Sequence, residues 1–179
     1  MEIIGLILAI AGLILAVVFW IFSPDWARKL FGMKEEDGDP HYKLIKRAQS
    51  GDAVAQYDLG IMYNFGDRVP LDHDLGFVWF SKAAEQNNLS AIHALGYSYE
   101  YGWGVDIDIE KAFEFYKKAA EQGHAGAQYS VGRAYFEALG VRPDNKKALI
   151  WLEKASEQGV LEADDLISTI AVLDEEDED

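Results

Sequence analysis

Hydrophobic residues are arranged along this chain in two different ways, and the first is a continuous run near its start. Residues 3–22 read IIGLILAIAGLILAVVFWIF, twenty positions without a charge. At about 1.5 Å of rise per residue, such a helix matches the roughly 30 Å hydrocarbon layer of a bilayer. The run predicts a transmembrane helix over residues 1–22 and a juxtamembrane linker over 23–38. A cleaved signal peptide is the alternative, but Glu2 replaces the basic start and no small-residue cleavage site follows.

Basic residues near this run lie only on its C-terminal side, at Arg28, Lys29 and Lys34. Because basic residues stay on the cytoplasmic side of a span, the remainder of the chain is expected to face the cytoplasm, with a periplasmic placement left open. Small residues also recur along one face of the predicted span, at Gly5, Ala9, Gly12 and Ala16. They could let a second helix approach closely, although the ordinary abundance of glycine and alanine in such helices is the preferred explanation.

The second arrangement is a pattern that recurs every 36 residues without insertion. Its columns include Gly60, Gly96 and Gly132; Tyr63, Tyr99 and Tyr135; Asp72, Asp108 and Asp144; Lys82, Lys118 and Lys154; Ala83, Ala119 and Ala155; and Trp79, Phe115 and Trp151. Self-similarity at this period is typical of a solenoid. We expect three repeats, over residues 51–86, 87–122 and 123–158.

Each repeat is predicted to form two helices joined by a turn. The first helices are expected over residues 52–64, 89–100 and 126–137, where small and apolar residues follow a helical spacing. The second helices are expected to begin at the aspartate of each repeat, which caps free amide groups, and to end near its lysine. The repeated glycine should let the two helices of a pair approach, with the repeated alanine on the facing surface.

Both ends of the repeat region depart from the pattern. Residues 39–50 read as half a repeat that forms an N-terminal cap helix, beginning with Asp39 and Pro40. Residues 160–173 resemble a first helix, but Ser168 and Ala171 stand where glycine and tyrosine are expected. This segment is therefore predicted to be a closing helix, so that the repeat domain covers residues 39–173. The acidic stretch 174–179 is predicted to be a disordered tail.

The motifs GHAGAQYSVGRAYFEALGV, residues 123–141, and DIEKAFEFYKKAAEQG, residues 108–123, carry a family resemblance. The chain resembles the Sel1-like repeat family, relatives of the tetratricopeptide repeats, over residues 51–159. The resemblance implies an all-α, right-handed solenoid that serves as an interaction scaffold, frequently bacterial, and it implies no reaction. With the predicted span it suggests a bacterial inner-membrane protein. Arg68 and Ala138 stand where the pattern has turn glycines, which puts the geometry of those two turns in question.

Composition removes several classes of function. Acidic residues outnumber basic ones by 31 to 16, giving a net charge of −15, so nucleic acid is not expected as a partner. Cysteine is absent, which excludes disulfides and thiolate metal sites. The four histidines lack a zinc-binding spacing. No residue set indicates catalysis, a cofactor or a small-molecule substrate, and the chain is not expected to be an enzyme.

Function is therefore expected to lie on a surface. By analogy with the tetratricopeptide frame, the first helices line the concave face, which would expose Tyr57, Ile61, Asn64, Phe65, His93, Tyr97, Glu100, Tyr101, Tyr129, Arg133, Phe136 and Glu137. Aromatic rings with an occasional arginine are typical anchors for a protein or peptide partner. The alternative is that several of the tyrosines only pack between repeats. We expect a membrane-anchored scaffold, or else an accessory or assembly subunit whose main contact is the transmembrane helix.

Overall fold

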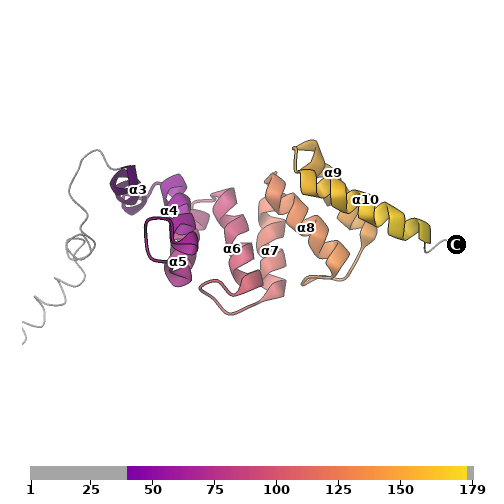
Figure 1. The fold of residues 1–179 in the computed structure, drawn as a ribbon, viewed down its shortest axis with the longest axis horizontal. Helices are drawn as coiled ribbons and strands as arrows, with labels where there is room; N and C mark the ends of the chain where they lie inside the picture. Colours follow the sequence, from indigo (N-terminus) through magenta and orange to yellow (C-terminus); the bar gives the residue numbers. More distant parts are fainter. Residues whose placement is uncertain (1–39, 177–179) are drawn as a thin grey trace, which may run out of the picture. The chain divides into compact units, whose positions relative to one another are not determined.

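The computed structural model describes residues 40–176, and every regular element in this range is a helix (Figure 1). The helices are α3 Pro40–Gln49, α4 Ala53–Phe65, α5 His73–Glu85, α6 Leu89–Tyr101, α7 Ile109–Ala120, α8 Ala125–Glu137, α9 Asn145–Glu157 and α10 Leu161–Glu176. The all-α prediction is confirmed for this part of the chain. The predicted membrane helix and its linker lie outside the described residues. Between residues 40 and 176, no helix has the length and apolar character needed to cross a bilayer.

The helices pack mainly against their neighbours along the chain, as three hairpins, α4–α5, α6–α7 and α8–α9, with α3 and α10 at the two ends (Figure 1). The core is divided accordingly into clusters along the stack. In the central cluster, Ile92 of α6, Tyr116 of α7 and Val131 of α8 are packed together and buried. Neighbouring hairpins therefore complete each other's core, as expected for a solenoid. The right-handed sense of the superhelix stays a prediction.

The second helix of each hairpin begins where the repeated aspartate predicts. Asp72, Asp108 and Asp144 each accept a hydrogen bond from the backbone amide three residues later, at 2.9, 3.0 and 3.0 Å. This bond satisfies one of the free amide groups at the helix start. It also favours the ionised carboxylate, and the pKa values of Asp108 and Asp144 lie below their usual range chiefly because of it.

The turn after each first helix keeps one geometry even where glycine is replaced. The residue after the helix is left-handed in all three hairpins, with φ of 68° at Gly66, 73° at Gly102 and 60° at Ala138. The alanine at position 138, where the repeat pattern has glycine, therefore leaves the turn geometry unchanged. Its left-handed conformation costs about 1–2 kcal/mol, because a Cβ in this region crowds the backbone.

Arg68 is the second residue that stands where the repeat pattern has a turn glycine, and its presence there has a steric explanation. The matching residues of the next two hairpins are Gly104 and Gly140, and a Cβ at either would collide with backbone atoms of His73 or Ile109 in the preceding hairpin. Arg68 follows only the single helix α3 in the described chain. Its guanidinium lies 2.9 Å from Nδ1 of His41 instead, so a side chain fits although φ is 58°.

The repeated glycine does allow close packing, but its predicted facing residue was wrong. A Cβ at Gly60 or Gly132 would lie 2.6 Å from a side-chain carbon of Phe80 or Leu152, and at Gly96 it would collide with the ring of Tyr116. These large residues, which are buried, precede the repeated alanine by three positions. The alanines are buried elsewhere in the same helices. Glycine therefore makes room for a large side chain and, at Gly60 and Gly132, also for the backbone of Gly76 and Ala148, whose carbonyl oxygens would lie 3.2 and 3.1 Å from an added Cβ.

The C-terminal helix α10 lacks the glycine that the first helices of the hairpins share, and its packing explains why. Ser168 takes the place of the column glycine in α10, where no second helix covers it within the described range; it is exposed and its hydroxyl donates to the Asp164 carbonyl at 2.9 Å. Since nothing packs there, glycine is not needed. The helix extends to Glu176, so residues 174–176, predicted as part of a disordered tail, are helical.

Candidate protein-binding site

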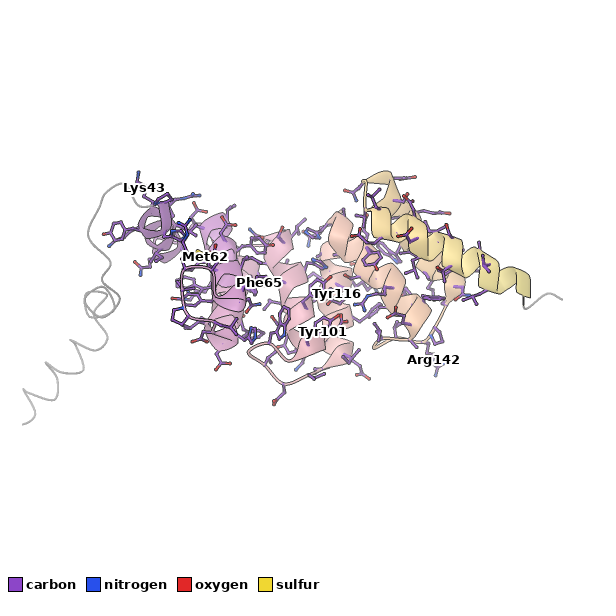
Figure 2. All side chains as sticks on the ribbon, in the orientation of Figure 1. Lys43, Met62, Phe65, Tyr101, Tyr116 and Arg142 are labelled. Carbon is purple, nitrogen blue, oxygen red and sulfur yellow. The ribbon has the colours of Figure 1, made fainter. Side chains whose placement is uncertain are left out.

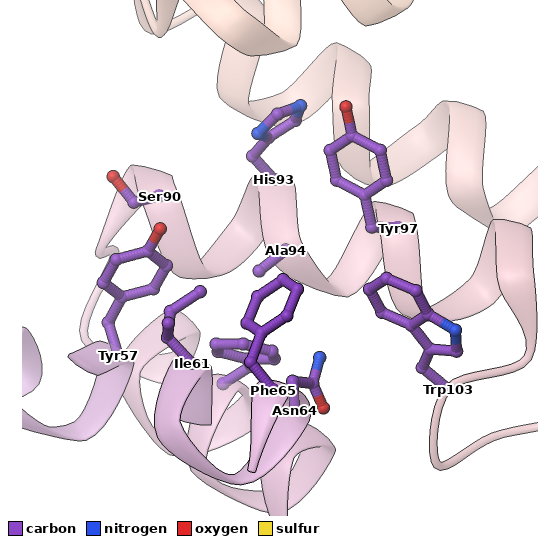
Figure 3. Close-up of a pocket in the computed structure, with 10 residues that line it drawn as sticks. Tyr57, Ile61, Asn64, Phe65, Ser90, His93, Ala94, Tyr97 and Trp103 are labelled. Carbon is purple, nitrogen blue, oxygen red and sulfur yellow. The ribbon is translucent and has the colours of Figure 1, made fainter. Parts of the chain in front are cut away.

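A pocket of about 250 Å³ opens between the first helices of the first two hairpins (Figure 3). It is lined by Tyr57, Ile61, Asn64 and Phe65 of α4, Phe80 of α5, Ser90, His93, Ala94 and Tyr97 of α6, and Trp103 of the following turn. We call this set the aromatic pocket. Figure 3 shows Phe65 in the middle of the view, with Tyr57 on one side and Trp103 on the other.

The rim of the aromatic pocket is a group of rings in mutual contact. Trp103 stacks on His73 at 5.4 Å between ring centroids and forms a T-shaped contact with Phe65 at 6.3 Å. Tyr101 follows at 5.7 Å from Trp103 and stacks on Tyr97 at 5.9 Å. Phe65 and Tyr101 keep 66 % and 49 % of their surface exposed. Both side chains are labelled in Figure 2. Large aromatic surface is thus offered to solvent beside an open pocket.

Six of the twelve residues predicted from the sequence line this pocket, and four lining residues were missed. Ser90 and Ala94 could have been found, because they lie one helical turn from His93 and Tyr97 on the same face. Trp103 lies in the turn after α6, outside the helical positions from which the concave face was predicted. Phe80 belongs to a second helix, and its contact with the column glycine brings it to the pocket floor.

Asn64 lines the pocket but is not the exposed contact that the sequence suggests. Only 5 % of its surface is accessible. Its Oδ1 lies 3.4 Å from Nδ1 of His73, and it packs so closely on Gly76 that a Cβ there would collide with it. Asn64 therefore joins α4 to α5, and its role is mainly structural.

Glu100 and Arg133 belong to a second cluster, between the second and third hairpins, that we call the polar network. Nη2 of Arg133 donates to both carboxylate oxygens of Glu100, at 2.7 and 2.8 Å. The hydroxyl of Tyr116 donates to the same carboxylate at 2.7 Å, and Glu137 lies 3.5 Å from Nη1 of Arg133. The side chains of Glu100 and Arg133 are only 9 % and 18 % exposed, so the predicted exposure of Glu100 was wrong.

The electrostatics of the polar network follow from this geometry. Burial, followed by the hydrogen bond to Glu100 and its negative charge, raises the pKa of the Tyr116 hydroxyl far above its usual value. Burial opposes the charge on Arg133, but the hydrogen bonds and charge of Glu100 outweigh that effect and raise the pKa of the guanidinium. The Arg133 guanidinium therefore stays charged and the Tyr116 hydroxyl stays protonated at neutral pH.

Tyr129 and Phe136, also predicted for the concave face, pack against the core cluster around Leu152. They join α8 to the C-terminal part of the stack, as in the alternative interpretation of the tyrosines. Glu137, at the end of α8, keeps 44 % of its side chain exposed. Of the four positions predicted on the third first helix, Glu137 is the exposed one, although its carboxylate also lies 3.5 Å from Nη1 of Arg133.

His93 stands at the boundary between the aromatic pocket and the polar network. Its Nε2 lies 3.0 Å from the hydroxyl of Ser130, and its ring is 4.9 Å from that of His124. Burial, and then the positive charges of His124 and Arg133, lower the pKa of His93 to about 3. The imidazole is therefore neutral at pH 7, and the pocket wall carries no charge there.

Comparison with known proteins places this geometry in a family. The Sel1 repeat matches residues 53–88, 89–124 and 125–160, which is more than half of the chain and agrees with the three hairpins. No curated protein matches.

Solved structures share the fold. A protective antigen of uropathogenic Escherichia coli that displays an SLR fold is 38 % identical, with a TM-score of 0.65 over 67 % of this chain and 26 % of the antigen. A Sel1 repeat protein from Oxalobacter formigenes is 36 % identical, with a TM-score of 0.63, over 72 % of this chain and 96 % of that protein. The cysteine rich protein B of Helicobacter pylori is 26 % identical, with a TM-score of 0.58, over 74 % of this chain and all of that protein. This chain spans about a quarter of the length of the antigen but nearly all of the other two. The chain belongs to the Sel1 repeat family.

Proposed function

We propose that this protein is a membrane-anchored scaffold that binds a segment of another protein across α4, α6 and α8 and catalyses no reaction of its own. The observation that carries the proposal is the aromatic pocket, with Phe65 and Tyr101 exposed at its rim. Burying such rings against a partner gains much apolar area at a low entropic cost. Sel1 repeat proteins generally mediate protein–protein interactions, which supports this role.

The anchor and the location are the second part of the proposal. Residues 3–22 carry no charge and have the length of a bilayer span, and basic residues follow them. These features support a single-pass protein of the bacterial inner membrane whose repeats lie on the cytoplasmic side. A tether of this kind raises the effective concentration of a bound partner at the membrane surface.

Site-specific photo-crosslinking in bacterial cells tests the binding role. A photoreactive phenylalanine analogue placed at Phe65 should give a discrete crosslinked product, because this side chain borders the pocket and is exposed. The matched control is Ile150 of α9, which is 51 % exposed but does not line the pocket. Equal products from both positions, or none from Phe65, would contradict binding at the pocket.

A second function, an assembly subunit that acts through its membrane helix, is favoured by the small-residue face at Gly5, Ala9, Gly12 and Ala16. The two functions differ in the effect of one substitution. Gly12→Ile should leave the Phe65 crosslink unchanged if the repeats select the partner. If the membrane helix makes the main contact, Gly12→Ile should remove the partner from the full-length complex.

A further inference from the structure

The aromatic pocket has the size and lining for one large apolar side chain. Its volume, about 250 Å³, is below the roughly 300–1,000 Å³ of typical small-molecule sites. None of its ten lining residues is an acid, a lysine or an arginine. Its one imidazole, His93, is held neutral by burial. A charged side chain placed inside would lose water without gaining a partner of opposite charge.

The equivalent place one repeat later is closed, so a ligand has a single register. Moving 36 positions along the sequence replaces Ala94 by Ser130 and Tyr97 by Arg133. Ser130 lies 3.0 Å from His93, and Arg133 is joined to Glu100. These contacts place the polar network at the second junction, whereas the first junction has an open pocket with an apolar lining.

Cations are scarce on the ligand side of the solenoid. The first helices α4, α6 and α8 carry three acidic residues, Asp58, Glu100 and Glu137, and a single basic residue, Arg133. Arg133 is already bound to Glu100 and lies close to Glu137. A partner therefore meets no free cation on these three helices.

Lysines are placed instead over aromatic rings that lie outside the pocket. Lys82 lies 4.1 Å above the ring of Trp79, and Lys154 lies 4.3 Å above that of Trp151. In the part of the chain that the structure describes, no such contact involves the exposed rings of Phe65 or Tyr101. Tyr97 stacks on one face of Tyr101, but the exposed parts of the Phe65 and Tyr101 rings remain available to cationic groups of a ligand, which exposed rings attract by about 0.5–1 kcal/mol each.

The net charge of the repeat domain also favours a positively charged ligand. Residues 40–173 contain nineteen acidic and thirteen basic residues. An acidic domain accelerates encounter with positively charged segments and disfavours acidic ones.

From these observations we infer that the ligand of the groove is a basic protein segment that inserts one large apolar side chain into the aromatic pocket and places lysine or arginine residues beside it. The apolar side chain contacts Phe65, Tyr97 and Trp103. The flanking cations lie against the exposed faces of Phe65 and Tyr101 and are attracted by Glu137. This inference rests on the proposed binding function and specifies its ligand.

A random dodecapeptide library displayed on phage, panned against the full chain in mild detergent, tests the inference. The selected peptides should combine one large apolar residue with at least two lysines or arginines. A synthetic peptide of the selected sequence should lose about tenfold in affinity when its basic residues are changed to glutamate, and its Kd should rise with salt.

Variants of the protein show where such a peptide binds. Ala94→Phe fills the pocket and Phe65→Ala removes its rim, and each should weaken the peptide by about tenfold or more. Ile150→Ala, on the exposed surface of α9, should bind as the parent does. Circular dichroism confirms that the variants are folded, and if Ala94→Phe fails to fold, Phe65→Ala decides, because that side chain is mostly exposed.

Failure of the inference differs from failure of the proposed function. Pocket-dependent peptides that are acidic, or that lack an apolar anchor, would overturn the ligand chemistry and leave the binding role intact. Peptides that bind equally to the parent and to both pocket variants, or a library without any binder, would overturn both.

Discussion

The bond between Glu100 and Arg133 leads to a prediction that separates structural from ligand-binding residues. Glu100→Ala removes the carboxylate that accepts from Arg133 and from the Tyr116 hydroxyl. Arg133 would then keep only the longer contact with Glu137, at 3.5 Å. Removing one partner of a buried ion pair costs about 3–5 kcal/mol, and an unsatisfied buried hydroxyl about 1–3 kcal/mol.

The two costs do not add fully, because both report on one carboxylate and Arg133 keeps 18 % of its side-chain surface in water. We therefore expect Glu100→Ala to lower the free energy of unfolding by about 3 kcal/mol. The double variant Glu100→Ala/Arg133→Ala should cost no more than either single change, since it leaves no buried charge behind. The resulting coupling energy should therefore be at least about 3 kcal/mol, the cost of the single change Glu100→Ala.

Urea unfolding of the full chain in mild detergent, followed by circular dichroism at 222 nm, measures these quantities, and an unchanged m-value shows that the variants are comparable. The control is Glu121→Ala. Its pair with Lys117 spans 3.8 Å, and both side chains are at least half exposed, so the cost should stay below about 1 kcal/mol. A loss below about 0.5 kcal/mol for Glu100→Ala, or no coupling to Arg133, would refute this reasoning and return both residues to the exposed ligand surface.

Three further predictions follow from single positions. Gly60→Ala should lower the free energy of unfolding by about 1–3 kcal/mol, because its Cβ would lie 2.6 Å from the buried Phe80 ring; an unchanged melting temperature would contradict this. Ala138→Gly should stabilise by about 0.5–1 kcal/mol and Gly102→Ala should destabilise by about as much, since both residues are left-handed; chemical denaturation should give opposite signs. The pKa of His93 is about 3 in the folded protein and about 6.5 in an unfolded chain. The stability that His93 contributes is therefore complete above pH 6.5, and about 2 kcal/mol of it is lost by pH 5. His93→Gln should remove that loss from a series of denaturation curves, and an unchanged pH dependence would exclude His93 as its origin.

The repeat sequence predicts helix positions well because they depend on local features. The aspartates that begin the second helices and the left-handed turns after the first helices recur at fixed spacing, and both determine geometry within a few residues. Even Ala138, where the pattern lacks glycine, keeps the turn, and its N–H donates to the Ala134 carbonyl as the amides of Gly66 and Gly102 donate to Met62 and Ser98.

The depth of a side chain could not be predicted in the same way. Asn64 and Glu100 occupy the same position in successive first helices, and helical spacing places both on the ligand side. Their burial depends on partners in other helices: Asn64 packs on His73 and Gly76 of α5, and Glu100 binds Arg133, which lies 33 positions later. The same limit explains the wrong facing residue for the column glycines, because helical period identifies a face but not which residue of the opposite helix meets it.

The columns of the repeat divide the domain into a frame and a variable surface. Positions that are identical in all three hairpins, such as Gly60 with its counterparts and Asp72 with its own, control helix contact and helix start. Positions that differ between hairpins, such as Ala94 and Ser130, decide whether a junction is open or closed. The first junction between hairpins therefore carries the open aromatic pocket and the second carries the polar network. Under the proposed binding function, the register of a bound segment would be set by these differences between the repeats.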